Sequence, residues 1–172
     1  MRWEALFRDL EAQAQAHEDA QWMHEVGERA RGERLSVSLA SRIAAARGQH
    51  IGLGLRDGSR VRGEVLDSGS DWVLLDDAGR QRLVAAGSIS VITGLTRRAD
   101  QLTAVESRLT IARTLRALSR ERSRVTIRAG VEVSGVISAV GEDHLDLATD
   151  AGAATTIPLA AIVEVVSAES AR

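Results

Sequence analysis

The spacing of apolar residues along the chain changes near residue 48. Before that point apolar side chains recur at three- and four-residue intervals, which is the pattern of amphipathic helices. We predict two N-terminal helices that break between Val26 and Arg34, where Gly27 and Gly32 fall, and that end at Gly48. The apolar positions of these helices are Trp3, Leu6, Phe7, Leu10, Trp22, Met23, Val26, Leu35, Leu39, Ile43 and Ala46.

From His50 onward, apolar and polar residues alternate, which is typical of half-buried strands. The first two runs flank Asp57 and Gly58, a pair that favours a tight hairpin turn. Three further runs lie around residues 72–75, 83–84 and 89–92. The pattern therefore predicts five short strands in this stretch.

The same stretch occurs twice in the chain. The offset that places Gly58 on Gly130 also places Gly63 on Gly135, and after one inserted residue Ile89 falls on Ile162. The helical pattern at residues 102–118 corresponds in the same way to that at residues 35–46. Recurrence at a fixed period indicates a duplicated supersecondary unit.

The sequence thus predicts an α+β fold, with N-terminal helices followed by two tandem five-stranded antiparallel barrels, each preceded by a helix. The expected domains are a helical extension at residues 1–34, a first helix and barrel at 35–95, and a second helix and barrel at 96–172. Because units of this size bury little core alone, we expect the copies, or several chains, to share apolar surface.

Residues 61–75, VRGEVLDSGSDWVLL, resemble the first motif of the Sm-like family, with a glycine in the second strand and an apolar third strand. Residues 87–92 resemble its second motif, and residues 135–147 and 160–166 repeat both motifs. The resemblance implies Sm-like barrels, whose pattern SH3-like barrels largely share, and an RNA-binding role. The whole chain is also similar to a family of Ala- and Arg-rich actinobacterial proteins.

The chain departs from the Sm-like pattern at the positions that would bind RNA. Gly69 and Gly141 stand where the family carries an aspartate, and Trp72 stands in the base-binding loop. These departures favour inheritance of the fold over inheritance of RNA recognition. Sm-like rings join the fourth strand of one barrel to the fifth of the next. Pro158 falls at the second copy's fourth strand, where it cannot donate to a ladder, so we expect a dimer or small closed homo-oligomer rather than a larger ring.

Composition narrows the classes of function. The 172 residues are 44% hydrophobic and 27% charged, as in ordinary folded proteins. The lack of Cys excludes disulfides and thiolate metal sites, and because all 22 basic residues are Arg, lysine-based catalysis is excluded too. No apolar run approaches the ~18 residues of a membrane helix, so we expect a cytoplasmic protein.

Arginine is concentrated around the second predicted helix. Nine arginines lie between residues 97 and 128, whereas residues 130–171 hold seven acidic residues and no basic one. These arginines either contact RNA phosphates or pair with the acidic second barrel and solvent. The candidate phosphate contacts are three residues on one face of the helix and two from a strand of the first copy: Arg113, Arg116, Arg120, Arg60 and Arg62.

The few aromatic residues have two possible roles each. Trp72, which aligns with His144, is a candidate for stacking on a base, and the alternative is core packing. Apolar residues of the N-terminal helices are candidates for a partner or oligomer interface, and the alternative is packing on the barrel. They are Trp3, Phe7, Leu10 and Trp22.

The four histidines do not form a recognisable site. His17 and His24 are seven residues apart, whereas zinc on a helix favours four-residue spacing, and the other two are isolated. No nucleophile, base and acid occur together, even beside the carboxylates of Asp76 and Asp77. We therefore expect no metal, no cofactor and no catalytic residue, and hence a protein that is not an enzyme.

Two functions follow from these observations. The first is binding of single-stranded RNA in a post-transcriptional or ribosome-linked role, which requires arginines free of the acidic second barrel. The alternative is a protein adaptor that self-associates and binds no nucleic acid, which requires Trp3, Phe7 and Leu10 to be exposed.

Overall fold

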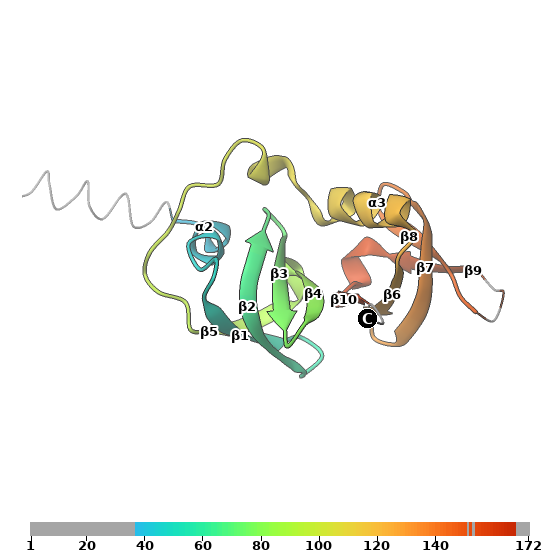
Figure 1. Cartoon of the computed structure of the whole chain (residues 1–172), viewed down its shortest axis with the longest axis horizontal. Helices are drawn as coiled ribbons and strands as arrows, with labels where there is room; N and C mark the ends of the chain where they lie inside the picture. Colours follow the sequence, from blue (N-terminus) through green and yellow to red (C-terminus); the bar gives the residue numbers. More distant parts are fainter. Residues whose placement is uncertain (1–36, 151, 153, 168–172) are drawn as a thin grey trace, which may run out of the picture. The chain divides into compact units, whose positions relative to one another are not determined.

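The computed structural model describes residues 37–150, 152 and 154–167 (Figure 1). Its α-helices are α2 (Leu39–Ala44) and α3 (Ile111–Glu121), and its 3-10 helices are η1 (Ala86–Ser88), η2 (Glu106–Arg108) and η3 (Leu159–Ala161). The strands are β1 (His50–Leu55), β2 (Arg60–Ser68), β3 (Trp72–Asp77), β4 (Arg80–Ala85), β5 (Ile89–Thr93), β6 (Arg124–Arg128), β7 (Glu132–Val140), β8 (His144–Ala148), β9 (Ala154–Pro158) and β10 (Glu164–Ser167).

All of these strands belong to one antiparallel sheet of ten strands, in the order β5-β1-β2-β3-β4-β10-β6-β7-β8-β9. The predicted α+β fold with two tandem barrels is therefore wrong, because the described residues are mainly β and form no closed barrel. A barrel would require β5 to pair with β4 in the first half of the sheet, and β10 to pair with β9 in the second half. Neither pairing occurs. Instead β4 pairs with β10, so the two halves satisfy each other's edge N–H and C=O groups.

The two halves of the sheet are built alike. Each places its fifth strand first, as β5-β1-β2-β3-β4 and as β10-β6-β7-β8-β9. A β-bulge lies between Val65 and Asp67 in β2, and another lies at the equivalent place in β7, between Ile137 and Ala139. Pro158 ends β9, which is one of the two free edges of the sheet, and β5 is the other.

Both helices differ from their predicted ranges of 35–46 and 102–118. α2 is shorter, and α3 begins later than predicted, at Ile111. The delay has a tertiary cause: Trp72 Nε1 donates to Leu109 O at 2.7 Å, and Asp71 accepts the Ile111 N–H at 2.8 Å. These bonds fix Leu109 and Thr110, between η2 and α3, in non-helical conformations.

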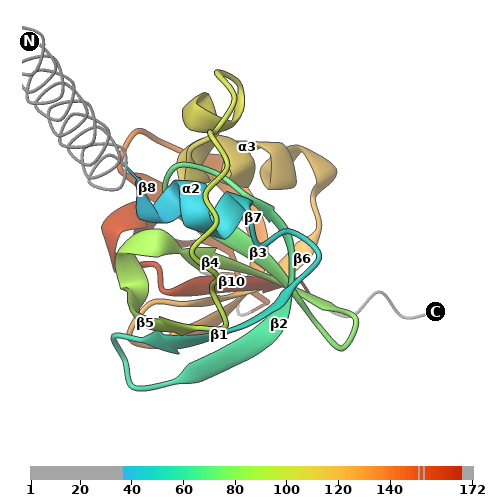
Figure 2. The ribbon, with the colours of Figure 1, turned by 90° about the vertical axis from the view of Figure 1, so that its left-hand side faces the viewer.

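The segment between β5 and α3 is attached to the first half of the sheet. It runs beside α2 (Figure 2), where Arg42 donates to Thr96 O at 2.9 Å and the Asp100 N–H donates to Ser41 O at 3.0 Å. Further along, Arg47 Nη2 lies 2.5 Å from a carboxylate oxygen of Glu106. Hydrogen bonds from the Thr103 backbone and from Arg47 hold the pKa of Glu106 at about 2, so this attachment stays charged at neutral pH.

The apolar core falls into two clusters that divide between the halves. One contains Ile43 of α2 and strands β1–β5, and the other contains Ile111 and Leu115 of α3 with strands β6–β10. Trp72 and Leu83 come from the first half of the sheet but belong to the second cluster. The pairing of β4 with β10 thus carries first-half side chains into the second core.

A buried carboxylate lies at the junction of the halves. Glu164 on β10 is 4% exposed, and one of its oxygens lies 3.1 Å from Arg82 Nη1 and 2.9 Å from Arg128 Nη2. Arg82 also pairs with Asp77, and Arg128 with Asp57. An unpaired charge would be strongly destabilising here, so these arginines fix Glu164, and with it β10, between β4 and β6.

We expect Gly63→Ala to lower the free energy of unfolding by about 1–3 kcal/mol, the usual cost of overpacking. A Cβ at Gly63 would lie 2.4 Å from the backbone oxygen of Asp76, which cannot move without breaking the ladder between β2 and β3. Urea denaturation measures the effect. The control is Gly87→Ala, since a Cβ there would meet no atom of another part of the described chain within 4 Å. Equal stability of the two variants would contradict the close approach at Gly63.

Candidate phosphate-binding surface

α3 packs its apolar side on the sheet and leaves most of its arginines outside. Ile111 and Leu115, four residues apart, are 8% and 0% exposed and belong to the second core cluster. Thr110 caps the helix by accepting the Arg113 N–H at 3.4 Å. This anchoring fixes which side of α3 faces solvent.

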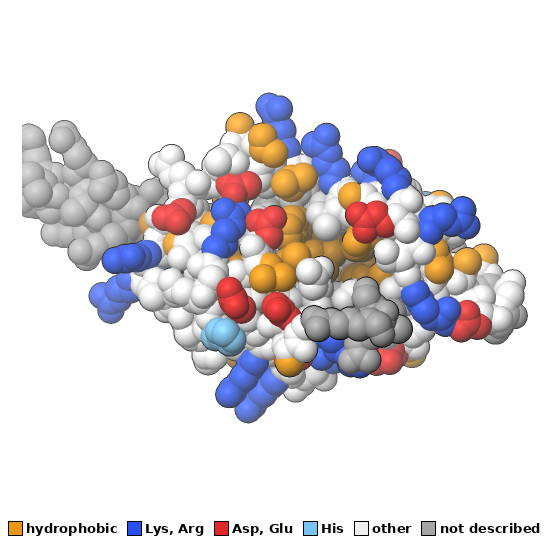
Figure 3. Space-filling model, in the orientation of Figure 1, with side chains coloured by type: hydrophobic (Ala, Val, Ile, Leu, Met, Phe, Trp, Pro, Cys, Tyr) orange, Lys and Arg blue, Asp and Glu red, His pale blue; other side chains and the backbone are white. Residues whose placement is uncertain are grey.

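Four arginines on or beside α3 are exposed and form no ion pair with any described residue: Arg108, Arg113, Arg120 and Arg122. Figure 3 shows arginine side chains spaced along the rim of the molecule where η2 and α3 lie. Cations separated in this way can contact successive phosphates of a strand without a closed pocket.

Three other arginines of the same stretch are engaged within the protein. Arg116, a predicted phosphate contact, is half-buried and donates to Val140 O at 3.3 Å and to Gly141 O at 2.6 Å. It therefore positions α3 over the turn between β7 and β8. Arg124 pairs with Asp150 and Arg128 with Glu164, so part of the stretch does pair with the acidic second half, as the alternative prediction held.

Arg60 and Arg62 lie on β2 of the first half, and both are exposed. α3 packs against β7 of the second half. No hydrogen bond or ion pair among the described residues joins Arg60 or Arg62 to the arginines of α3. The predicted phosphate contacts are thus divided between two elements rather than gathered in one site.

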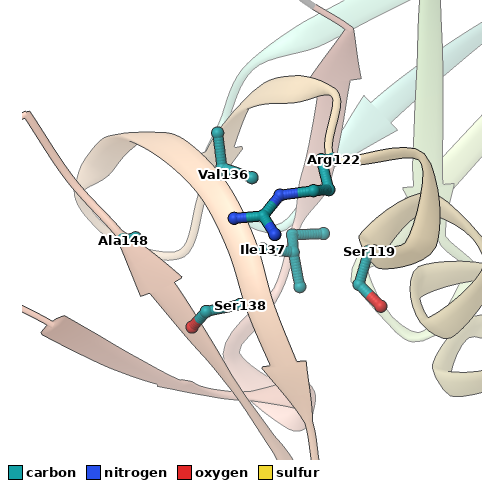
Figure 4. Close-up of a pocket in the computed structure, with 6 residues that line it drawn as sticks. All are labelled: Ser119, Arg122, Val136, Ile137, Ser138 and Ala148. Atoms are coloured by element: carbon teal, nitrogen blue, oxygen red, sulfur yellow. The ribbon is translucent and has the colours of Figure 1, made fainter.

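A small pocket of about 330 Å³ lies at the C-terminal end of α3. Arg122, which has a left-handed φ of 52°, extends its guanidinium over Ile137, and the hydroxyls of Ser119 and Ser138 lie on either side (Figure 4). The hydroxyls of Ser119 and Ser138 donate to Arg116 O at 2.9 Å and to Asp146 O at 3.0 Å, so Arg122 is the group lining this pocket that can bind an anion. The sequence pattern does not single out Arg122, because the turn that directs it into the pocket depends on packing against β7.

Trp72 is not a stacking platform. Its ring is 4% exposed, packs in the second core cluster and donates to Leu109 O, so the prediction of base stacking is wrong and core packing is the observed role. The other predicted interface residues, Trp3, Phe7, Leu10 and Trp22, lie outside the described residues.

A larger groove of about 740 Å³ lies at the N-terminal end of α3. It is lined mostly by small and apolar residues of η1, η3 and the start of α3, and its charged lining residues are Arg56, Asp71 and Glu142. No sequence pattern pointed to it, because its walls come from turns that are far apart in the chain. The part of the chain that the structure describes contains no cluster of three His, Cys, Asp or Glu suited to a metal ion.

His144 and Asp143 form the one His–carboxylate pair among the described residues, with Nδ1 2.8 Å from an Asp143 oxygen. This hydrogen bond raises the pKa of His144 above its ordinary value and lowers the pKa of Asp143. The pair is exposed, so it can be reached by a ligand or by another chain.

Comparison of the whole chain with protein-family models and with curated proteins finds no match. In the described range, no helix has the length and apolar character needed to cross a membrane. The proposal for function therefore rests on the geometry of the described residues.

We expect Asp143→Asn to lower the pKa of His144 toward its ordinary 6.5, because the carboxylate hydrogen bond is the largest cause of the rise. Because the pKa of His144 is higher in the folded protein than in the unfolded chain, its bond to Asp143 stabilises the folded protein below pH 6.5. This stabilisation is lost as the pH rises through the raised pKa. An NMR titration of the His144 ring protons measures the change. Asp146→Asn, which removes only a weaker through-space interaction, should lower the pKa less; an equal fall would contradict the assignment.

Proposed function

We propose that this protein is a non-enzymatic, cytoplasmic RNA-binding protein that contacts the phosphate backbone through the exposed arginines of α3, in a post-transcriptional or ribosome-linked role. The observation that carries the proposal is the division of arginines described above. Arg113 and Arg120 have no ion-pair partner among the described residues, whereas Arg116, between them, is bound to the sheet. Pairing with the described residues thus does not account for Arg113 and Arg120.

The chemistry of this surface favours binding that is independent of base sequence. Guanidinium groups neutralise phosphates and release counterions, so affinity falls steeply as salt rises. Trp72, the one aromatic residue in the described range, is buried, and base stacking by these residues plays no part. Arg122, just beyond the C-terminal end of α3, adds a further phosphate contact to those of Arg113 and Arg120.

The test is a fluorescence-anisotropy titration of a mixed-sequence single-stranded RNA at several salt concentrations. Arg113→Ala with Arg120→Ala should weaken binding and reduce the slope of log affinity against log salt by about 1.4, the expected effect of losing two phosphate contacts to a single strand. The matched control is Arg60→Ala with Arg62→Ala, which removes the same charge from β2.

If both double variants weaken binding equally, the interaction is general electrostatic attraction, and α3 is not the binding surface. If the wild-type protein binds no RNA even at low salt, RNA binding is wrong. The protein-adaptor function would then remain, with its interface sought among residues 1–36.

A further inference from the structure

The turn at residues 69–72, between β2 and β3, holds the chain segment that leads into α3. Trp72 Nε1 donates to Leu109 O at 2.7 Å, and the Asp71 carboxylate accepts the Ile111 N–H at 2.8 Å. The turn itself is shaped by a bond of 3.0 Å from Gly69 N to Trp72 O, and by another of 2.8 Å from the first residue of η1 to Asp71 O. Segment 109–111 is therefore bound at both ends, by Trp72 at the Leu109 carbonyl and by Asp71 at the Ile111 N–H.

The second half contains the same turn, and no hydrogen bond from another described segment reaches the Asp143 or His144 side chain. At residues 141–144 the Gly141 N–H donates to His144 O at 2.8 Å, and the Leu159 N–H at the start of η3 donates to Asp143 O at 2.7 Å. The His144 ring also occupies the place of the Trp72 ring. A Cβ at Gly141 would lie 2.9 Å from His144 Nε2, just as a Cβ at Gly69 would lie close to the Trp72 ring. Asp143 and His144, the counterparts of Asp71 and Trp72, have side chains that are 89% and 46% exposed.

The counterpart of the held segment is also exposed. The offset that relates the two halves places Thr110, the N-cap of α3, on Ser38, the N-cap of α2, and each side chain accepts the N–H three residues later. Val37 and Leu39 are 42% and 49% exposed, whereas Ile111, the counterpart of Leu39, is 8% exposed. First-turn N–H groups such as that of Leu39 lack a partner inside their own helix.

We propose that residues 37–39 of a second copy of this chain dock on the turn at residues 141–144, as residues 109–111 dock on the turn at residues 69–72 within one chain. The Leu39 N–H donates to the Asp143 carboxylate, and His144 Nε2 donates to the Val37 carbonyl. Leu39 packs near the imidazole, as Ile111 shares the second core cluster with Trp72. This inference is independent of RNA binding.

The same placement brings the free edges β9 and β5 of the two copies together, as β4 and β10 are inside one chain. That outer contact is weaker than the inner one. Four residues that bind across the inner junction are replaced at the outer edges: Ala85 by Pro158, Ser88 by Ala161, Arg82 by Thr155 and Glu164 by Val91. In the inner junction the Ala85 N–H and the Ser88 hydroxyl both donate to Val163 O, at 3.1 and 3.0 Å. The outer contact lacks these bonds and the buried ion pair, so association is reversible.

The proton state of His144 controls the docking. Because Nδ1 is bound to Asp143, Nε2 can donate only when the ring is protonated or changes tautomer. The other charged groups near the ring are Glu142 in the turn, Asp146 on β8 and Arg116 of α3, which binds the Gly141 carbonyl; η3 and segment 37–39 carry none. Protonation gives two donors, so docking strengthens as the pH falls through the pKa of His144.

The test is the molar mass of the full-length protein by light scattering after gel filtration, over protein concentrations from micromolar to submillimolar. The wild type should gain mass with concentration. Leu39→Asp and, separately, Asp143→Ala with His144→Ala should each remain monomeric. Asp suits the first turn of a helix, so the first variant keeps α2 folded. Val131→Asp, at a residue that is 67% exposed in another turn, is the matched control and should behave as the wild type.

Mixing the two monomeric variants should give a heterodimer and nothing larger, because each retains one of the two different half-sites. His144→Trp, which recreates the donor of the first turn, should associate at least as tightly as the wild type and without pH dependence. The proposal is wrong if the wild type stays monomeric at every concentration, if either variant keeps the wild-type mass, or if the mixture stays monomeric.

Discussion

The pairing of β4 with β10 is the contact on which the described structure depends. It turns two five-stranded halves into one sheet, and it brings Trp72 and Leu83 into the core beneath α3. Val165 and Leu83 face each other in this pairing, at 2% and 3% exposure, and Glu164 places its carboxylate between arginines from either side. Apolar burial supplies the stability here, and the buried ion pair fixes the register.

The strands could be predicted because they depend on local patterning. Alternation located every strand of the first half. The aligned glycines lie at equivalent places in the two halves: Gly58 and Gly130 in turns, with φ values of 84° and 77°, and Gly63 and Gly135 in β2 and β7. Which edges would pair could not be predicted. The sequence of an alternating strand such as β4 does not show whether the strand closes its own barrel or pairs with the other half of the sheet. The pairing partner depends on contacts with β10, at the far end of the described chain.

In the candidate site too, features set by neighbouring residues could be predicted, whereas contacts between residues far apart in the chain could not. Helical spacing placed Arg113, Arg116 and Arg120 on one side of a helix. It could not show that Arg116 would reach the carbonyls of Val140 and Gly141, because that contact requires α3 to cross β7. Trp72 was ambiguous for the same reason: its partner, Leu109, lies 37 residues along the chain, in a stretch that was predicted to be helical and so to have its carbonyls bonded within the helix.

The two halves differ most where their positions in the sheet differ. Turn 69–72 binds segment 109–111 and carries the buried Trp72, whereas turn 141–144 carries the exposed His144, a residue whose charge responds to pH. The edge strands of the two halves also differ according to their position. Glu164 is buried within the sheet, whereas Pro158 lies at a free edge. A duplicated unit with identical edges would pair as readily between chains as within one. The outer edges lack the buried charge and the N–H donor of the inner junction, and this difference favours the intrachain pairing of β4 with β10.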